Sequence, residues 1–363
     1  MRFWLSLIIG IIVIGGLLTL IYKNNEDQKE IADTEAFIGK WLTNKNGTLS
    51  TYIKEGDKVD SEFVKGRETL SESIGIWMEY LIVKDDQIKF EKAYTVFMNN
   101  FFEKDGFIRW KLTETGDSKA SANALVDDLR ILEALFAASE RWDDQRYEKS
   151  AKSISNFLMN FNEKENVLTD YYVKGGGAGP YITLSYIEPK ALSRLDTLGL
   201  IDKVIYENML SILANAQLDG SFFPKAFDVD KGIYLYDTKV NMIDQALVAL
   251  YRSKEDYSTK EFLNFIKNEI EVQEKVYGQY DRKTGKAVVK YESPSVYGWL
   301  ILYCLEVKEY PLAQQLYERM IHFKSKEPEY TGGYSVNDDN THIFDNLVPL
   351  LAEIEMIQLK LIK

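Results

Sequence analysis

Residues 68–103 read ETLSESIGIWMEYLIVKDDQIKFEKAYTVFMNNFFE and contain two apolar patterns separated by the pair Asp85-Asp86. Apolar residues recur mainly every three or four positions over 68–84 and again over 87–103, as on one face of an amphipathic helix. A link this short makes the two helices antiparallel neighbours. The stretch therefore predicts a helical hairpin.

The same spacing recurs along the rest of the chain and predicts twelve helices, with a period of about 55 residues from pair to pair. Their predicted ranges are 30–43, 68–84, 87–103, 121–139, 143–162, 184–198, 201–218, 239–253, 258–272, 293–307, 309–323 and 342–361. Short links, such as 141–142, alternate with long stretches rich in Gly, aromatic and acidic residues. Six such hairpins closing on themselves give an all-α fold, an (α/α)6 barrel. The stretch 278–291 predicts a small β-hairpin on one rim.

The N-terminus holds an uncharged run of twenty residues, FWLSLIIGIIVIGGLLTLIY, at positions 3–22. As a helix it spans about 30 Å, the thickness of the bilayer hydrocarbon. No small-x-small cleavage site and no cysteine for lipid attachment follow it. We predict a single-pass membrane anchor over 1–23, a tether over 24–30 and one folded domain over 31–363, located outside the cell. A secreted protein, cleaved at an unrecognised site, is the alternative.

Composition narrows the functional classes. The chain has 44 Lys and Arg against 56 Asp and Glu, a formal net charge of −12, so nucleic acid is a poor partner. With Cys304 as the single cysteine, a disulfide within the chain and a cysteine-based zinc site are excluded. Two histidines, His322 and His342, exclude a three-His metal site and disfavour a Ser-His-Asp triad. Any catalysis is expected to depend on carboxylates, without metal or organic cofactor, in a monomer.

Aromatic residues make up 13% of the chain, and many lie in the long stretches between helix pairs. Aromatic faces stack on the C–H faces of sugar rings, so this density favours an extended sugar-binding groove. The alternative is that these tyrosines only pack the loops.

Three carboxylates stand out by their positions. Glu72 lies near the start of a predicted helix among small and apolar residues, surroundings that raise a carboxyl pKa and suit a general acid. Gly75 costs that helix about 1 kcal/mol relative to Ala, which a close approach to the backbone would explain. Asp128 lies on another helix, and Asp237 precedes a third. Structural interpretations stay open for all three carboxylates: a dipole-favoured acid, a solvated charge and an N-cap.

The segments around these carboxylates resemble the motifs of glycoside hydrolase family 8. The matches are SESIGIWM (71–78) to SEGxGYGM, DGFIRW (105–110) to GLLAWRW, SANALVDDLRILEAL (121–135) to ATDADLDIAYAL, TLSYIEP (183–189) to PSYFxP, and YLYDTKVNM (234–242) to YDAxRxP. They occur in the family's order across residues 68–242, and the family's (α/α)6 barrel agrees with the predicted helices.

The resemblance implies an inverting glycoside hydrolase with Glu72 as general acid and Asp237 as general base. It also implies that Asp128 holds the sugar at the cleavage point, although a slip of one residue to Asp127 stays open. A polysaccharide is the implied substrate, and no cofactor is needed. The implied substrate-binding aromatic residues, taken together with the loop tyrosines, are Trp110, Tyr172, Tyr181, Tyr186 and Tyr236.

The chain also departs from the family motifs. Val126 and Arg130 stand where the family has aspartates, and Val240 and Met242 replace the Arg and Pro of YDAxRxP. These positions usually shape the cellulose or chitosan subsite, so we expect a divergent, endo-acting member with a different β-linked substrate. With its predicted anchor, the chain looks like the hydrolases associated with bacterial exopolysaccharide and biofilm synthesis.

Four alternatives stay open. One is a cellulase or chitosanase of the same family, and another is a non-catalytic polysaccharide-binding protein on the same fold. An (α/α)6 polysaccharide lyase would need a Tyr or His base and a cation to neutralise a uronate, which this acidic chain fits poorly. An anchored structural protein would lack an aromatic-lined cleft.

Overall fold

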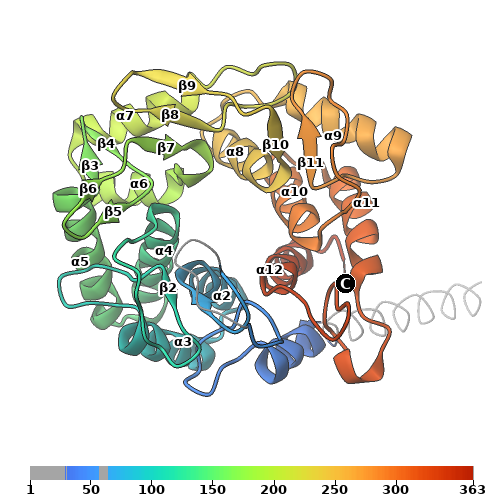
Figure 1. Cartoon of the computed structure of the whole chain (residues 1–363), viewed down its shortest axis with the longest axis horizontal. Helices are drawn as coiled ribbons and strands as arrows, with labels where there is room; N and C mark the ends of the chain where they lie inside the picture. Colours follow the sequence, from blue (N-terminus) through green and yellow to red (C-terminus); the bar gives the residue numbers. More distant parts are fainter. Residues whose placement is uncertain (1–28, 30, 57–63, 363) are drawn as a thin grey trace, which may run out of the picture.

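The computed structural model describes residues 29, 31–56 and 64–362, and within them twelve helices form two concentric rings (Figure 1). The inner ring consists of α2 (Ser71–Lys84), α4 (Leu125–Trp142), α6 (Pro189–Thr197), α8 (Met242–Lys254), α10 (Pro294–Glu306) and α12 (Phe344–Gln358). The outer ring consists of a helix over 31–41, α3 (Gln87–Asn100), α5 (Gln145–Phe161), α7 (Lys203–Ala214), α9 (Lys260–Gln273) and α11 (Tyr310–Met320). Each inner helix packs against the next, and α12 packs against α2. The predicted twelve helices and (α/α)6 barrel are confirmed.

Two of the short links between paired helices share one chemistry. Asp85 adopts the left-handed conformation, with φ of 62°, and ends α2, while Asp86 caps α3 by accepting a backbone hydrogen bond. Asp143, with φ of 53°, and Asp144 do the same between α4 and α5. The second link therefore lies two residues beyond the predicted 141–142, because the cap residues and not the apolar spacing end the helix.

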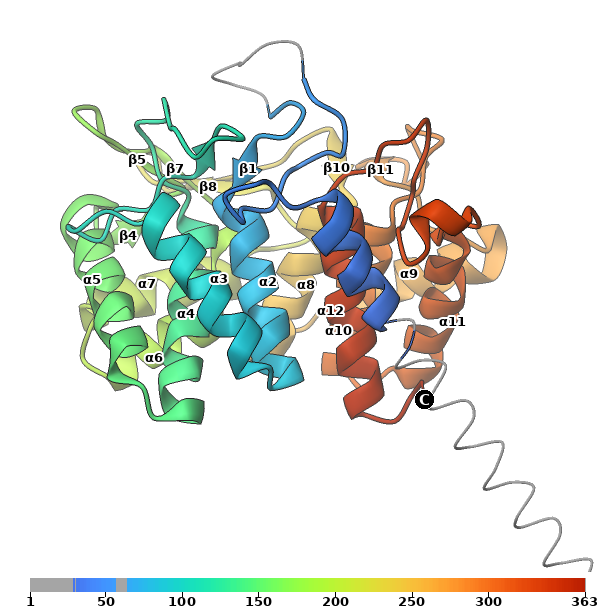
Figure 2. The same ribbon diagram turned by 90° about the horizontal axis from the view of Figure 1, so that it is seen from below.

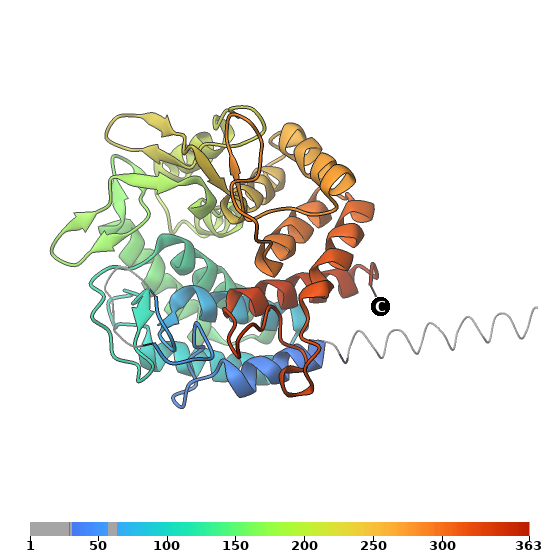
Figure 3. The same ribbon diagram turned by 45° about the vertical axis from the view of Figure 1, so that its right-hand side comes forward.

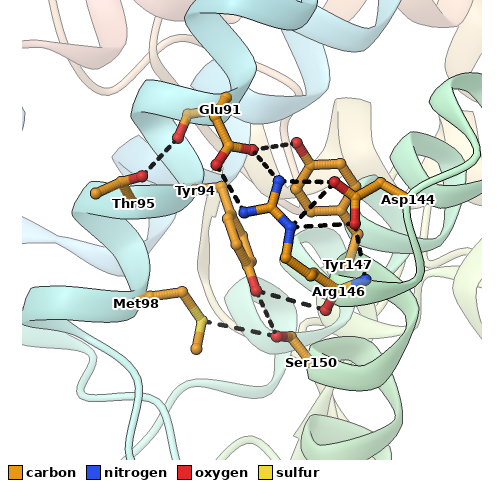
Figure 4. Close-up of polar contacts among 8 residues, drawn as sticks. All are labelled: Glu91, Tyr94, Thr95, Met98, Asp144, Arg146, Tyr147 and Ser150. Carbon is orange, nitrogen blue, oxygen red and sulfur yellow. Dashed lines mark hydrogen bonds and ion pairs between the residues drawn. The ribbon is translucent and has the colours of Figure 1, made fainter.

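A polar network joins α3 to α5 in the outer ring (Figure 4). Arg146 donates to both oxygens of Glu91, at 3.0 and 3.1 Å, and pairs with Asp144 at 2.7 Å. The Tyr147 hydroxyl donates to Glu91 at 2.5 Å. The Arg146 side chain is 59% exposed, so these charges meet at the protein surface.

Gly75 lies where α2 crosses α4. A methyl group at this position would lie 3.3 Å from Cγ1 of Ile131 and 3.4 Å from Cδ of Arg130. The close approach expected from the sequence is confirmed. The missing side chain lets the two inner helices meet and seats the Arg130 stem against α2.

Short strands gather on the face where the inner helices begin (Figure 2). They are β1 (Thr69–Leu70), β2 (Lys111–Leu112), β3 (Glu163–Lys164), β4 (Val167–Leu168), β5 (Tyr172–Val173), β6 (Gly177–Ala178), β7 (Tyr181–Thr183), β8 (Ala226–Asp228), β9 (Ile233–Leu235), β10 (Lys239–Asn241) and β11 (Gln279–Asp281). All pairs are antiparallel: β1–β2, β3–β4, β5–β6, β7–β8–β9 and β10–β11. This rim holds more β-structure than the single hairpin that the sequence predicted.

The predicted hairpin over 278–291 forms only in part. A single bridge joins Tyr280 to Ala287, whereas β11 pairs in full with β10. That register places Val240 opposite Tyr280, and both side chains are completely buried. Burial of this cross-strand pair explains why β11 pairs with a distant segment.

The ends of the described chain meet where the ring closes. Helix 31–41 lies beside α12 (Figure 2, Figure 3), and Thr34 Oγ1 donates to the Gly332 carbonyl at 3.0 Å. Within the residues that the structure describes, no helix is both long and apolar enough to cross a membrane. The predicted anchor, 1–23, lies outside those residues.

Candidate active site

A groove of about 600 Å³ opens on the strand-bearing face. Its lining includes Asp170, Tyr181, Tyr186, Lys225, Tyr236, Asp237 and Asp244. The residues come from the rim strands and the loops beside them, from the short 3-10 helix Leu184–Tyr186 and from the first turn of α8. Rim segments therefore form its walls, and the start of an inner helix contributes to its base.

Glu72 lies in the first turn of α2. That helix begins where β1 ends, and the Ser71 backbone N–H donates to the Trp110 carbonyl at 3.0 Å, which anchors this start to the rim. The Glu72 side chain is 31% exposed, and Glu72 is not among the residues that line the groove.

The surroundings of Glu72 favour its protonated form. Burial of the carboxyl, followed by the charge of Asp127, raises its pKa to about 8. Asp244 adds to this effect, while the positive charge of Arg130 opposes it. A carboxyl group that keeps its proton at neutral pH can act as a proton donor.

Asp127 and Asp128 have different surroundings, because neighbouring residues project about 100° apart around a helix. Asp127 Oδ2 accepts a hydrogen bond from the Ser71 hydroxyl at 2.5 Å, and its charge acts on Glu72. Asp128 is 1% exposed, and its Oδ2 accepts from the Asn123 amide at 2.5 Å. Burial raises the pKa of Asp127 to about 6 and that of Asp128 well above its ordinary value. Asp127 is thus the aspartate that lies beside Glu72, whereas Asp128 is bonded to Asn123.

Asp237 lies in the loop between β9 and β10, where Arg282 holds it. Arg282 Nη2 donates to Oδ1 of Asp237 at 2.5 Å, and Nε donates to the Asp237 carbonyl at 2.6 Å. The same guanidinium donates to the carbonyls of Phe222 and Phe223, at 3.0 and 2.9 Å. The Asp237 side chain is 26% exposed and that of Arg282 only 3%. A buried arginine therefore fixes a carboxylate that remains open to the groove.

Four charged residues of this site were not predicted from the sequence: Asp170, Lys225, Asp244 and Arg282. Asp244 Oδ1 accepts from the Ser185 hydroxyl at 3.0 Å. Burial raises the pKa of Asp244, and it raises that of Asp170 to about 6. In the sequence, Asp244 resembles any acidic residue of a first helical turn, and the other three resemble ordinary loop charges.

The predicted aromatic residues divide into two groups. Three of them line the groove: Tyr181, Tyr186 and Tyr236. Trp110 lies at the start of α2, bonded through its carbonyl to Ser71. The ring of Tyr172 packs against Phe157 and Phe161 of α5, with centroids 5.7 and 5.3 Å away. For Tyr172 the contacts fit the loop-packing alternative.

The acidic residues share one electrostatic neighbourhood. The Tyr186 hydroxyl is subject to the charges of Asp127, Asp170, Glu72 and Asp244, which, after burial, raise its pKa. Asp244 in turn is subject to the charge of Asp237. Among the described residues, no group of three or more His, Cys, Asp or Glu side chains is arranged to hold a metal. Carboxyl groups with raised pKa values are suited to proton transfer.

Comparison with known proteins identifies the family. Residues 29–189 match the model for "Glycosyl hydrolases family 8". The Bacillus subtilis protein named "Putative lipoprotein YdaJ" is 33% identical over 332 residues, which cover 91% of this chain and 88% of that protein.

Two solved structures share the fold over most of their length. A novel alpha-amylase from Clostridium perfringens has a TM-score of 0.80 at 25% identity, covering 90% of this chain and 97% of that one. PssZ from Listeria monocytogenes has a TM-score of 0.72 at 27% identity, covering 88% and 93%. The family resemblance drawn from the motifs is confirmed: the chain belongs to the glycosyl hydrolases of family 8 and is a glycoside hydrolase.

Proposed function

We propose that this protein cleaves a bacterial extracellular polysaccharide with inversion, using Glu72 as general acid and Asp237 as general base. The observation that supports this most is the contrast between the two carboxyls: the pKa of Glu72 is raised to about 8, whereas Asp237 is bound by Arg282. Glu72 protonates the leaving glycosidic oxygen. Asp237 takes a proton from a water molecule that attacks from the opposite face of the sugar.

Asp127 replaces Asp128 in the proposed role of holding the sugar at the cleavage point. It lies next to Glu72, and the Ser71 hydroxyl donates a hydrogen bond to its carboxylate. A carboxylate there accepts hydrogen bonds from sugar hydroxyls and stabilises the positive charge that develops on the ring.

For the substrate we propose a β-linked exopolysaccharide or biofilm glycan, cleaved internally. The departures from the cellulase motifs, and the resemblance to hydrolases associated with exopolysaccharide synthesis, support this choice. We further propose that the apolar segment 3–22 anchors a monomeric enzyme outside the cell. The lipoprotein named among the relatives supports an extracytoplasmic location, although this chain has no cysteine before Cys304 to receive a lipid.

A second candidate substrate is an α-linked glucan. The alpha-amylase from Clostridium perfringens has the same fold over 97% of its chain, with a TM-score of 0.80. An amylase-like activity would use the same groove and the same pair of carboxyls.

The test is release of reducing ends by the full-length protein, in mild detergent, from bacterial exopolysaccharides, cellulose, chitosan, xylan and starch. Glu72→Gln and Asp237→Asn are expected to lose activity by about 10²-fold or more. Glu91→Gln, on the outer ring, is the matched control and should retain it. Equal activity in all four proteins would refute the assigned pair, and NMR of the first anomer released tests inversion.

A second pair of variants separates the neighbouring aspartates. Asp127→Asn is expected to lower kcat, because it removes a charge beside Glu72. Asp128→Asn should act mainly on stability, because Asp128 is bonded to Asn123. The reverse pattern would return the positioning role to Asp128.

A further inference from the structure

Arg130 lies near the centre of the inner ring, between Glu72 and a second cavity. This cavity, of about 410 Å³, is lined by later turns of the inner helices, including Glu79 on α2 and Trp299 on α10. Arg130 Nη1 is 4.0 Å from Glu72 Oε1, and its Nε is 3.6 Å from Glu79 Oε2. Its guanidinium carbon lies 5.6 Å from the centroid of the Trp299 ring. One buried cation is thus shared between two carboxyls of the same helix.

The contacts of Arg130 are unlike those of a structural arginine. Its side chain is 5% exposed, yet within the described residues neither Nη1 nor Nη2 has a hydrogen-bond partner. Arg282, by contrast, donates to two backbone carbonyls and to Asp237. The Tyr251 side chain of α8 bonds to Arg130. Burying a guanidinium whose two terminal nitrogens lack hydrogen bonds is nevertheless costly, so the main feature that Arg130 contributes is its charge.

The charged and titratable groups that face Arg130 and Glu72 determine how readily Glu72 ionises. Arg130 faces Glu72 and Glu79 of α2, Asp127 of its own helix and Tyr251 of α8. Glu72 faces Asp127, Arg130 and, from α8, Asp244. Tyr186 of the rim is also within reach of its charge. Two of these neighbours are acids that oppose ionisation of Glu72, and the one that favours it is Arg130.

We infer that Arg130 is a positioning residue for catalysis, whose buried charge keeps Glu72 acidic enough to surrender its proton to the glycosidic oxygen. The inference rests on the proposed role of Glu72. A carboxyl surrounded only by other acids would hold its proton too tightly to transfer it efficiently, because a general acid works best when its pKa is near the working pH.

Three variants of the full-length protein test the inference: Arg130→Met, Arg130→Lys and Glu79→Gln. The first removes the charge, the second keeps it, and the third removes an acid that competes for it. Glu79 has a side chain that is 42% exposed, so Glu79→Gln is expected to fold. Two readouts apply: the carboxyl titration of Glu72 by ¹³C NMR, assigned with Glu72→Gln, and the pH profile of kcat/KM.

The expected shifts have opposite signs. Arg130→Met should move the Glu72 titration and the alkaline limb of the profile upward by about 1–3 pH units, the effect of losing an opposite charge at this distance. Arg130→Lys should leave both near their wild-type positions, and Glu79→Gln should move both downward by less. A purely structural arginine would lower stability without moving either readout.

The outcomes separate the two proposals. An unmoved Glu72 titration in folded Arg130→Met, or an upward shift in Glu79→Gln, overturns the role of Arg130. Should Arg130→Met fail to fold, the sign of the Glu79→Gln shift decides. If the titration moves as expected but Glu72→Gln stays fully active, the role of Glu72 as acid fails, and with it the catalytic purpose of Arg130.

Discussion

Both rings contain carboxyl groups, but those of the outer ring lie at the surface with charged partners, whereas those of the inner ring are buried beside other acids. On the outer ring, hydrogen bonds from Arg146 lower the pKa of Asp144 at the protein surface. On the inner ring, burial and the charge of Asp127 raise the pKa of Glu72 to about 8. Paired charges in water add a little stability and no reactivity. A buried carboxyl group with few compensating partners costs stability, but it keeps a proton that it can transfer. The location and the partners of a carboxyl group therefore decide its role, rather than its residue type.

The largest effect is expected from removing the Glu72 carboxyl group of the inner ring. Glu72→Gln should lower kcat by about 10²–10⁴-fold, because it removes the proposed proton donor and keeps its shape. Asp144→Asn, in the outer network, should leave kcat unchanged. Steady-state kinetics on the substrate identified by the polysaccharide panel measure both. Comparable losses in the two variants would show that Glu72 has no special role.

Next in size is the loss of the arginine behind Asp237. Arg282→Met should lower the free energy of unfolding by about 2–4 kcal/mol, because it strands two buried carbonyls and a partly buried carboxylate. Activity should fall as well, since Asp237 is no longer fixed. Chemical denaturation and kinetics on the folded fraction measure the two losses. A stable Arg282→Met with wild-type kcat would contradict the positioning of Asp237 described above.

The free energy of unfolding should depend on pH in opposite directions for carboxyl groups of the two rings. Glu72 is expected to release its proton near 4.5 when unfolded and near 8 when folded. The folded state therefore binds more protons between these values, and Glu72 makes the free energy of unfolding fall as pH rises through this window. Asp144, whose pKa is lowered, contributes stability that is lost as pH falls below its ordinary value of 3.8.

Denaturation of wild type and Glu72→Gln from pH 4 to 9 tests the inner-ring sign. The slope between about pH 4.5 and 8 should be shallower in the variant. An unchanged slope would mean that Glu72 titrates as an exposed carboxyl.

The smallest expected effect lies in the outer network. Arg146→Met should lower Tm slightly, because it removes exposed ion pairs with Glu91 and Asp144. Added salt should shrink the difference, since screening already weakens these pairs in the wild type. A large, salt-independent drop would show that this network stabilises the rings more than its exposure suggests.

The fold was predictable because its signal is local. Helical spacing is visible in each segment, and a short link such as Asp85-Asp86 fixes the direction of the next helix. The pairing of β10 with β11 was not predictable, because it depends on burial of Val240 against Tyr280, forty residues away in the chain.

The site was predictable only where motifs mark it. The order of the family segments points to Glu72 and Asp237 as candidates, but a loose helical match does not decide between Asp127 and Asp128. Asp170 and Asp244 have no local signal, because closure of the ring brings them together. In the sequence, Arg130 stood out only as a departure from the family motif. Its proposed role rests on its distances to Glu72 and Glu79.

Closure of the ring also constrains how the chain folds. The inner ring is complete only when α12 packs against α2, and Thr34 bonds to Gly332, 298 positions later. Contacts so distant in sequence form slowly, because a long loop must close before they stabilise anything. During synthesis, α2 is made long before α12, the helix against which it packs. The ring is therefore expected to close only after α12 has been synthesised, and loss of α12 should expose apolar surface on both α2 and α10.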